Sequence, residues 1–191
     1  MQVIFFLVGM LPVAFIIFWI VAYFIGDKAE KKYTAAQLES GEDKRIFMNF
    51  ARSLFDQPDA YTYVAGSHIK TVKTGSSEYT YYFYSYVVAF NQEGELWVCP
   101  YACQNHVPVL RNKMKIDFSE AAISYNVKKK QTDVTIRIAG DPLEIWVEDI
   151  VQGDGTDDTQ APFALDQTAE REKLNQVLPK FKELRKQQKK G

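Results

Sequence analysis

The most conspicuous feature of the hydrophobic pattern is an uninterrupted apolar run near the start of the chain. Residues 3–25 are 23 consecutive residues without a charge, and an α-helix of that length is roughly 34 Å long, enough to cross a hydrocarbon core of about 30 Å. The run predicts a transmembrane helix over residues 1–26, in which Pro12 is tolerated. Representative anchor residues of this helix are Val3, Ile16, Trp19, Tyr23 and Ile25.

Two other interpretations of this run fit the residues less well. A cleaved signal peptide needs a charged n-region, a shorter apolar core and a small-x-small cleavage site, and the segment lacks all three. A core helix of a globular protein would not be apolar on every face. Lys28, Lys31 and Lys32 follow the run, whereas no Lys or Arg precedes it. The cations predict a single-pass protein of the cell membrane with its C-terminal domain in the cytoplasm.

The next segment, residues 27–59, has helical periodicity and is predicted to be a juxtamembrane helical linker. Alanine, lysine and glutamate favour a helix up to a break at Ser40-Gly41. A second short helix then carries apolar residues at steps of three and four. These residues are Ile46, Phe47, Phe50, Leu54 and Phe55.

From residue 60 to residue 151 the period changes from 3.6 to 2, and β-branched and aromatic residues dominate between polar turns. Short turns predict antiparallel neighbours closed into a small barrel or sandwich. The predicted strands are Tyr61–Ala65, Ile69–Lys73, Tyr79–Phe90, Glu95–Pro100, Lys113–Asp117, Ala122–Lys128, Asp133–Ala139 and Leu143–Glu148.

An acidic loop over residues 151–164 and a closing amphipathic helix complete the predicted fold. Asp166 is a plausible cap for that helix, and Pro179 within it predicts a kink or local break. One apolar stripe should cover the barrel. The stripe consists of Leu174, Val177, Leu178, Phe181 and Leu184.

The order of these elements resembles the pleckstrin-homology-like (PH-like) fold, including the bacterial PH-like domains. The resemblance covers residues 60–188, and it is closest in the hairpin segment Tyr86–Tyr101 and in Ile116–Tyr125 before the next hairpin. It implies an α+β domain in which two nearly orthogonal sheets form a small antiparallel β-barrel or sandwich and a C-terminal amphipathic helix caps one end. It also implies a binding or interaction module without catalysis.

Two groups of lysines are candidates for contact with anionic lipid headgroups. Lipid-binding members of the PH family use a basic loop between the first two strands, where this chain offers His68, Lys70 and Lys73 but no arginine. The run Lys128, Lys129 and Lys130 in a later hairpin could meet an anionic surface at about 1 kcal/mol per cation. A solvated strand edge and a solvated turn are the simpler interpretations.

Cys99, Cys103 and His106 are weak candidates for a metal site. The three side chains are soft or borderline ligands within eight residues, and zinc could use them if a fourth ligand came from elsewhere. The spacing lacks a Cys-x-x-Cys knuckle, so we expect reduced thiols half-buried beside Trp97 and Tyr101, and no metal or cofactor.

The run from Tyr79 to Phe90 is aromatic on both faces of one strand, which exceeds what one core needs. One face should line the barrel. We expect the other set, taken as Tyr82, Tyr84 and Tyr86, to receive the helix that carries Phe47 and Phe50, or else to bind a partner.

Composition and motifs narrow the function. A formal net charge of -1 over 191 residues disfavours nucleic acid as a partner. The chain has no nucleophile elbow, zinc-protease, phosphate-loop or Rossmann motif, so no enzyme activity is expected. The sequence predicts a membrane-anchored protein-interaction or scaffold module with an unidentified protein partner, and the alternative is a tethered module that binds anionic lipid headgroups or another small ligand.

Overall fold

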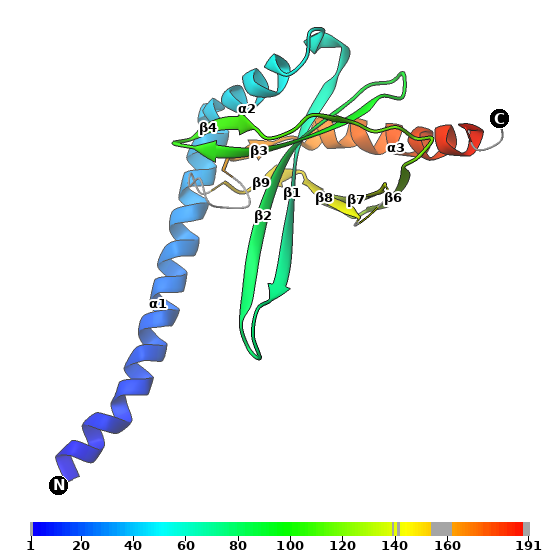
Figure 1. The fold of residues 1–191 in the computed structure, drawn as a ribbon. Coiled ribbons are helices and arrows are strands. Elements are labelled where there is room, and N and C mark those ends of the chain that lie inside the picture. Colours follow the sequence, from blue (N-terminus) through cyan, green and yellow to red (C-terminus); the bar gives the residue numbers. More distant parts are fainter. Residues whose placement is uncertain (1, 139, 141, 154–161, 189–191) are drawn as a thin grey trace.

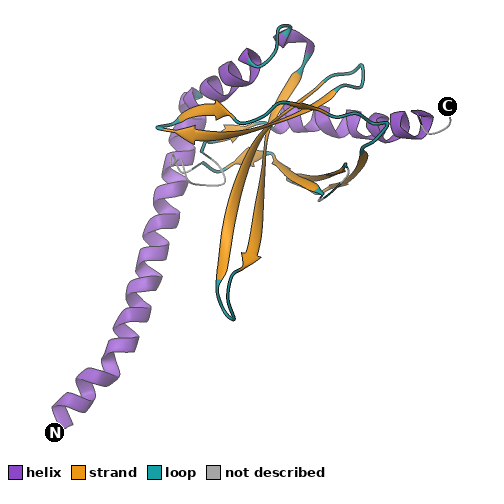
Figure 2. Cartoon of the chain, viewed as in Figure 1, coloured by secondary structure: helices purple, strands orange, loops and turns teal. Residues whose placement is uncertain are grey.

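A computed structural model describes the chain apart from residues 1, 139, 141, 154–161 and 189–191, and apart from the side chains of residues 2–15, 17, 24, 25, 29, 30, 187 and 188. The chain forms an α+β structure in which an antiparallel sheet sandwich is covered by a C-terminal helix (Figure 1). A long N-terminal helix extends away from this domain (Figure 2).

The N-terminal helix, α1, runs from Gln2 to Ser40, and the second helix, α2, from Glu42 to Ser53. Gly41 separates them with a φ of 67°, a left-handed conformation that glycine adopts without steric cost. The predicted break at Ser40-Gly41 is therefore confirmed. Among the described residues, α1 runs without interruption from residues 2–26 into the residues that follow.

Within the part of the chain that is described, no helix combines enough length with enough apolar character to span a membrane. Of the predicted anchor residues, Ile16, Trp19 and Tyr23 have exposed side chains. The side chains of Val3 and Ile25 lie outside the described residues.

A one-turn 3₁₀ helix, η1 (Pro58–Ala60), leads into an eight-stranded antiparallel sheet with the strand order β4-β3-β2-β1-β8-β7-β6, in which β5 also pairs with β3. A separate pair, β9 (Ile150–Val151) and β10 (Leu165–Asp166), lies between the sheet and the last helix in the chain order. The strands of the large sheet are β1 (Thr62–Lys73), β2 (Tyr79–Phe90), β3 (Leu96–Gln104), β4 (Val107–Leu110), β5 (Met114–Lys115), β6 (Ala122–Val127), β7 (Gln131–Arg137) and β8 (Leu143–Glu148).

Several predicted strands differ from the observed ones. Tyr61–Ala65 and Ile69–Lys73 are parts of one strand, β1, because Gly66 continues the ladder opposite Tyr86. A Cβ at Gly66 would stand 2.4 Å from Cγ2 of Ile145, so glycine here allows β8 to approach and does not make a turn.

The segment after Pro100 also differs from the prediction. β3 continues to Gln104, and β4 follows a tight turn at Asn105 and His106, whose φ values of 51° and 62° are those of a type I′ hairpin turn. β5 keeps only two residues of the predicted strand Lys113–Asp117. The predicted ends of β2 and β8 are confirmed.

Two hydrophobic clusters lie on opposite faces of the sheet. The first fills the interior of the sandwich, where Val64, Tyr86 and Val88 pack with α3 (Thr168–Gln188). The predicted stripe is confirmed, because its first four members are almost fully buried and Leu184 packs against them. Helix α3 continues through Pro179, so the predicted local break is wrong.

The second cluster lies between the other face of the sheet and α2. Phe47 of α2 packs there with Val87, Ala89 and Tyr101. The predicted docking of this helix on Tyr82, Tyr84 and Tyr86 is therefore wrong. Tyr86 points into the sandwich interior, whereas α2 packs against the opposite face of β2, which carries Val87 and Ala89.

Asp43 joins this second cluster to α1 and to the end of the acidic loop. Its carboxylate is buried and accepts hydrogen bonds from the Ala164 amide at 2.8 Å and the Tyr33 hydroxyl at 3.2 Å. Thr34 of α1 donates to the carbonyl of Gly153 at 3.0 Å. The middle of the predicted acidic loop lies outside the described residues, but Phe163 and Ala164 at its end are buried.

Candidate functional site

The candidate site is a β-ribbon that projects from the domain, residues 68–84, which we call the arm. Strands β1 and β2 pair along their whole length, from Thr62 opposite Phe90 to Lys73 opposite Tyr79. The neighbours of this pair end earlier: β8 meets β1 at Ser67, and β3 meets β2 no further than Ser85. The arm consequently extends beyond the rest of the sheet (Figure 1).

Large aromatic side chains cover the arm and are exposed. The same strand becomes buried from Ser85 onward, where β3 begins to pair with it. A run of adjacent exposed aromatic residues of this kind marks an interaction surface more often than a plain solvated one. The exposed fractions are 54% for Tyr79, 58% for Tyr81, 48% for Tyr82, 46% for Phe83 and 39% for Tyr84.

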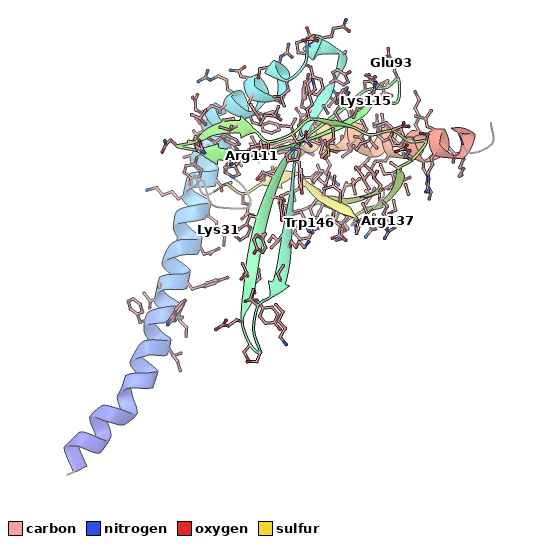
Figure 3. The ribbon with its side chains drawn as sticks, viewed as in Figure 1. Lys31, Glu93, Arg111, Lys115, Arg137 and Trp146 are labelled. Atoms are coloured by element: carbon pink, nitrogen blue, oxygen red, sulfur yellow. The ribbon has the colours of Figure 1, made fainter. Side chains whose placement is uncertain are left out.

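The two faces of the arm differ in composition. Because side chains alternate along a strand, the face that continues the α2 side of the sheet carries Tyr79, Tyr81 and Phe83, with Ile69 opposite Phe83. The other face carries Tyr82 and Tyr84 and continues the sandwich interior. Figure 3 shows side chains standing out on both sides of this ribbon, beyond Trp146 at its root.

The root of the arm is an aromatic layer around His68. Its ring is stacked with that of Tyr84 at 6.3 Å and meets Trp146 edge-on at 5.2 Å. Nδ1 of His68 has no hydrogen-bond partner among the described residues and lies 3.8 Å from a carboxylate oxygen of Glu144. The layer fixes the point at which the arm leaves the domain.

The candidate lysines form two groups that the fold does not bring together. Lys70 and Lys73 are on the arm, opposite Tyr82 and Tyr79. Lys128, Lys129 and Lys130 form the turn between β6 and β7, which lies at the Glu148 end of β8 because Gln131 pairs with Glu148. The arm leaves β8 in the opposite direction, past Trp146.

The second lysine turn is held by a buried arginine. Arg171 at the start of α3 is 6% exposed, forms an ion pair with Asp149, and donates to the carbonyls of Lys128 and Lys129, each at 3.3 Å. Nζ of Lys128 lies 2.6 Å from a carboxylate oxygen of Asp133. These contacts hold residues 128–130 in place, and we call these residues the braced turn.

The three weak metal candidates do not converge on one point. Cys99 and Cys103 are four positions apart on β3, which separates their backbones by about 13 Å along the strand. His106 instead contacts Asp43, with Nε2 3.0 Å from Oδ1. The described residues contain no group of three His, Cys, Asp or Glu side chains that could hold a metal ion.

The thiols are more deeply placed than the sequence predicted. Cys99 is 0% exposed and Cys103 is 7% exposed, whereas we expected half-buried side chains. Burial raises the pKa of Cys99 to about 11. A thiol in this state is a poor nucleophile and a poor metal ligand.

Among the described residues, the apolar hollow inside the sandwich is too small for a ligand. An enclosed apolar cavity of about 10 Å³ lies between Val88, Ile136 and Leu174, and this volume suits about one water molecule. Larger hollows are open at the surface. One of about 360 Å³ lies beside Gly41 and Lys44 at the start of α3, and its lining mixes apolar, acidic and basic side chains.

The predicted elements do not include the arm as a separate unit, although the aromatic run from Tyr79 to Phe90 is a predicted surface feature. A signal for it exists in the sequence: the predicted strand Tyr79–Phe90 has 12 residues, whereas the predicted strand after it, Glu95–Pro100, has six. A strand that is much longer than its neighbour must overhang it, unless a further strand pairs with the excess.

Comparison of the chain with protein families, with curated proteins and with solved structures finds no match. The resemblance to PH-like domains stays a prediction.

Proposed function

We propose that the chain is a single-pass membrane-anchored, non-catalytic interaction module. In this proposal residues 3–25 cross the cell membrane, the PH-like domain stands at its cytoplasmic face, and the arm is the binding surface. The observation that carries the proposal is the run of five exposed aromatic side chains on the arm, in a domain whose enclosed interior cavity has a volume of only about 10 Å³.

Support for the anchor comes from exposed side chains on α1. Phe18, Ile20 and Val21 are exposed by 68%, 49% and 49%. Successive residues of an α-helix are 100° apart, so these positions, with Ile16, point to several sides of the helix. Apolar exposure on several sides suits a helix surrounded by lipid. Lys28, Lys31 and Lys32 after the run favour a cytoplasmic domain.

Support for a PH-like domain comes from the strand order. Consecutive strands pair from β1 to β4 and from β6 to β8, β1 also pairs with β8, and α3 packs into the sandwich interior. This arrangement agrees with the strands and capping helix that the resemblance implies.

A second candidate function, contact with anionic lipid headgroups, is favoured by the positions of two lysines. Lys70 and Lys73 lie on the arm among its tyrosines, so cations and aromatic side chains share one surface. The braced turn at Lys128–Lys130 and the small interior cavity do not contribute to this surface.

The test of the proposed function uses the full chain in cells. Membrane fractions are washed with alkaline carbonate, and a photo-crosslinking amino acid replaces Tyr81 in one variant and Val127 in a matched control. Val127 is 48% exposed and lies beside the braced turn. We expect the chain to stay in the washed membranes and to form adducts from position 81 only. Release by carbonate, or equal adducts from both positions, would contradict the proposal.

A further inference from the structure

Contact of the arm with another surface would stabilise it. A two-stranded ribbon is marginal by itself, and both of its outer edges carry backbone groups that lack a sheet neighbour. Here the ribbon also exposes aromatic side chains on both faces. The fold maintains this projection, because the aromatic layer of His68, Tyr84 and Trp146 fixes its root.

The arm and α1 leave the domain from neighbouring points. Thr34 of α1 binds the carbonyl of Gly153, which follows Val151 by two residues. Val151 and Ser67, the last residue of β1 before the arm, line the same small hollow. In the view of Figure 1, the arm and the N-terminal part of α1 extend to the same side of the domain.

The lengths of these two projections match. Lys73 lies six positions after Ser67, which corresponds to about 20 Å of β-strand. About 20 Å of α-helix contains about 13 residues, and a helix of that length measured back from Thr34 ends near Val21. By this measure Lys73, at the outer end of β1, reaches the level of Trp19 and Tyr23, in the last part of the apolar run.

The chemistry of the arm suits the boundary between lipid and water. Tyrosine has an apolar ring and a polar hydroxyl, and it is enriched at that boundary. Lysine places its aliphatic stem along apolar surface and its ammonium group among headgroups. The arm contains Lys70 and Lys73 against one acid, Glu78, so it carries a positive charge. That charge favours an anionic surface.

From these observations we infer that the arm inserts the outer, aromatic part of β2, around Tyr79 and Tyr81, into the headgroup region of the same bilayer that anchors α1, and so holds the domain against the membrane by a second contact. The inference rests on the membrane anchor of the proposed function, because the depth of the arm is counted from the membrane-spanning helix, and it develops the second candidate function, contact with anionic lipid headgroups. It assigns an anionic phospholipid surface as the occupant of the arm.

The test places a reporter on the arm of the full chain. The variants Tyr81→Cys and Val127→Cys are labelled with an environment-sensitive fluorophore, and labelling is selective because Cys99 and Cys103 are buried. The proteins are reconstituted in vesicles of phosphatidylcholine and phosphatidylglycerol that contain a lipid with a spin label near its headgroup. We expect a blue shift and quenching for the label at position 81, and neither for the label at position 127.

Charge reversal provides a second measurement that does not touch the aromatic residues. In the Tyr81→Cys background, Lys70→Glu with Lys73→Glu should lower the quenching in mixed vesicles to the level seen in phosphatidylcholine alone. The matched pair Lys129→Glu with Lys130→Glu, at the other end of the domain, should leave the quenching unchanged.

Three outcomes would overturn the inference. An aqueous spectrum at position 81, in a protein that resists carbonate extraction, would leave the anchor intact and remove the second contact. A shifted spectrum without lipid quenching, together with Tyr81→Cys disulfide dimers, would assign the arm to a second copy of the chain. A protein that carbonate releases would remove the anchor and the inference together.

Discussion

Oδ1 of Asp43 lies 3.0 Å from Nε2 of His106, although the two residues are 63 positions apart in the chain. Asp43 stands in the first turn of α2, and His106 forms the tight turn between β3 and β4. The other oxygen of the same carboxylate accepts the Ala164 amide and the Tyr33 hydroxyl. The buried Asp43 side chain thus links both α1 and α2 to the sheet through hydrogen bonds.

Loss of this carboxylate should destabilise the fold strongly. Asp43→Ala leaves the buried Ala164 amide without its acceptor, so we expect the free energy of unfolding to fall by about 2–3 kcal/mol. The matched control is Asp59→Ala, because Asp59 is 86% exposed in an ion pair with Arg52, and its effect should stay within about 0.5 kcal/mol. Guanidinium unfolding of the full chain in detergent measures both. Equal losses of unfolding free energy in the two variants would show that the Asp43 contacts do not stabilise the fold.

Gly66 should tolerate no side chain, although it lies in the middle of a regular strand. A Cβ there would stand 2.4 Å from Cγ2 of Ile145, a β-branched residue that is almost fully buried. We expect Gly66→Ala to cost about 1–3 kcal/mol through overpacking. Gly75→Ala in the turn of the arm is the control, since its Cβ would meet only the flexible side chain of Glu78.

A double-mutant cycle assigns the cost at Gly66 to its cause. Ile145→Ala is itself destabilising because it leaves a cavity, by about 2–5 kcal/mol. In combination with Gly66→Ala, however, it removes the clash, so the double variant should lose less stability than the sum of the single variants. If the two losses of stability simply add, the cost of Gly66→Ala does not come from a clash with Ile145.

The alternation of apolar and polar residues predicted the ends of β2 and β8 correctly, because these ends depend on nearby turn residues. It could not separate Tyr84 from Tyr86. Both lie on the same face of β2, two positions apart, yet Tyr86 is 4% exposed and Tyr84 is 39% exposed. The difference depends on where β8 and β3 stop pairing, which is set by distant parts of the chain.

Asp43 shows the same limit for the core. At the start of a helix rich in charged residues it is expected to be solvated, and its partners Ala164 and His106 lie 121 and 63 positions away. The prediction of two strands, Tyr61–Ala65 and Ile69–Lys73, in place of the single strand β1 was wrong for a related reason. A glycine between two apolar segments is typical of a turn, and the close approach of Ile145 that requires it here leaves no local signal.

The two cysteines should be nearly inert in the native protein. Cys99 is fully buried, and burial raises its pKa to about 11. At neutral pH, therefore, less than about one per cent of the Cys99 side chains are thiolates. We expect both Cys99 and Cys103 to react with a thiol reagent far more slowly in the folded chain than in guanidinium. Chelation by EDTA should leave the unfolding midpoint unchanged. Fast reaction in the native state would contradict the burial of β3.

Asp166 should make the stability of the fold depend on acid pH. The amide and the hydroxyl of Thr168, at the start of α3, donate to its carboxylate, and these bonds lower its pKa below the usual 3.8. A lowered pKa in the folded state means that the ionised form stabilises the fold. The contribution is complete above the unfolded pKa near 3.8, and it is lost as the pH falls through the lower pKa of the folded state.

The variant Asp166→Asn isolates this contribution, because its amide oxygen can still accept a hydrogen bond but does not titrate. We expect it to be less stable than the parent chain at neutral pH, by only about 0.5 kcal/mol because the carboxylate is largely exposed. The difference should shrink to nothing in strong acid. Thr168→Val, which removes the hydroxyl donor but keeps the amide, should give a smaller pH dependence than the parent chain. Guanidinium unfolding across the acid range measures these differences, and a gap between the parent and Asp166→Asn that persists in strong acid would contradict the role of the ionised carboxylate.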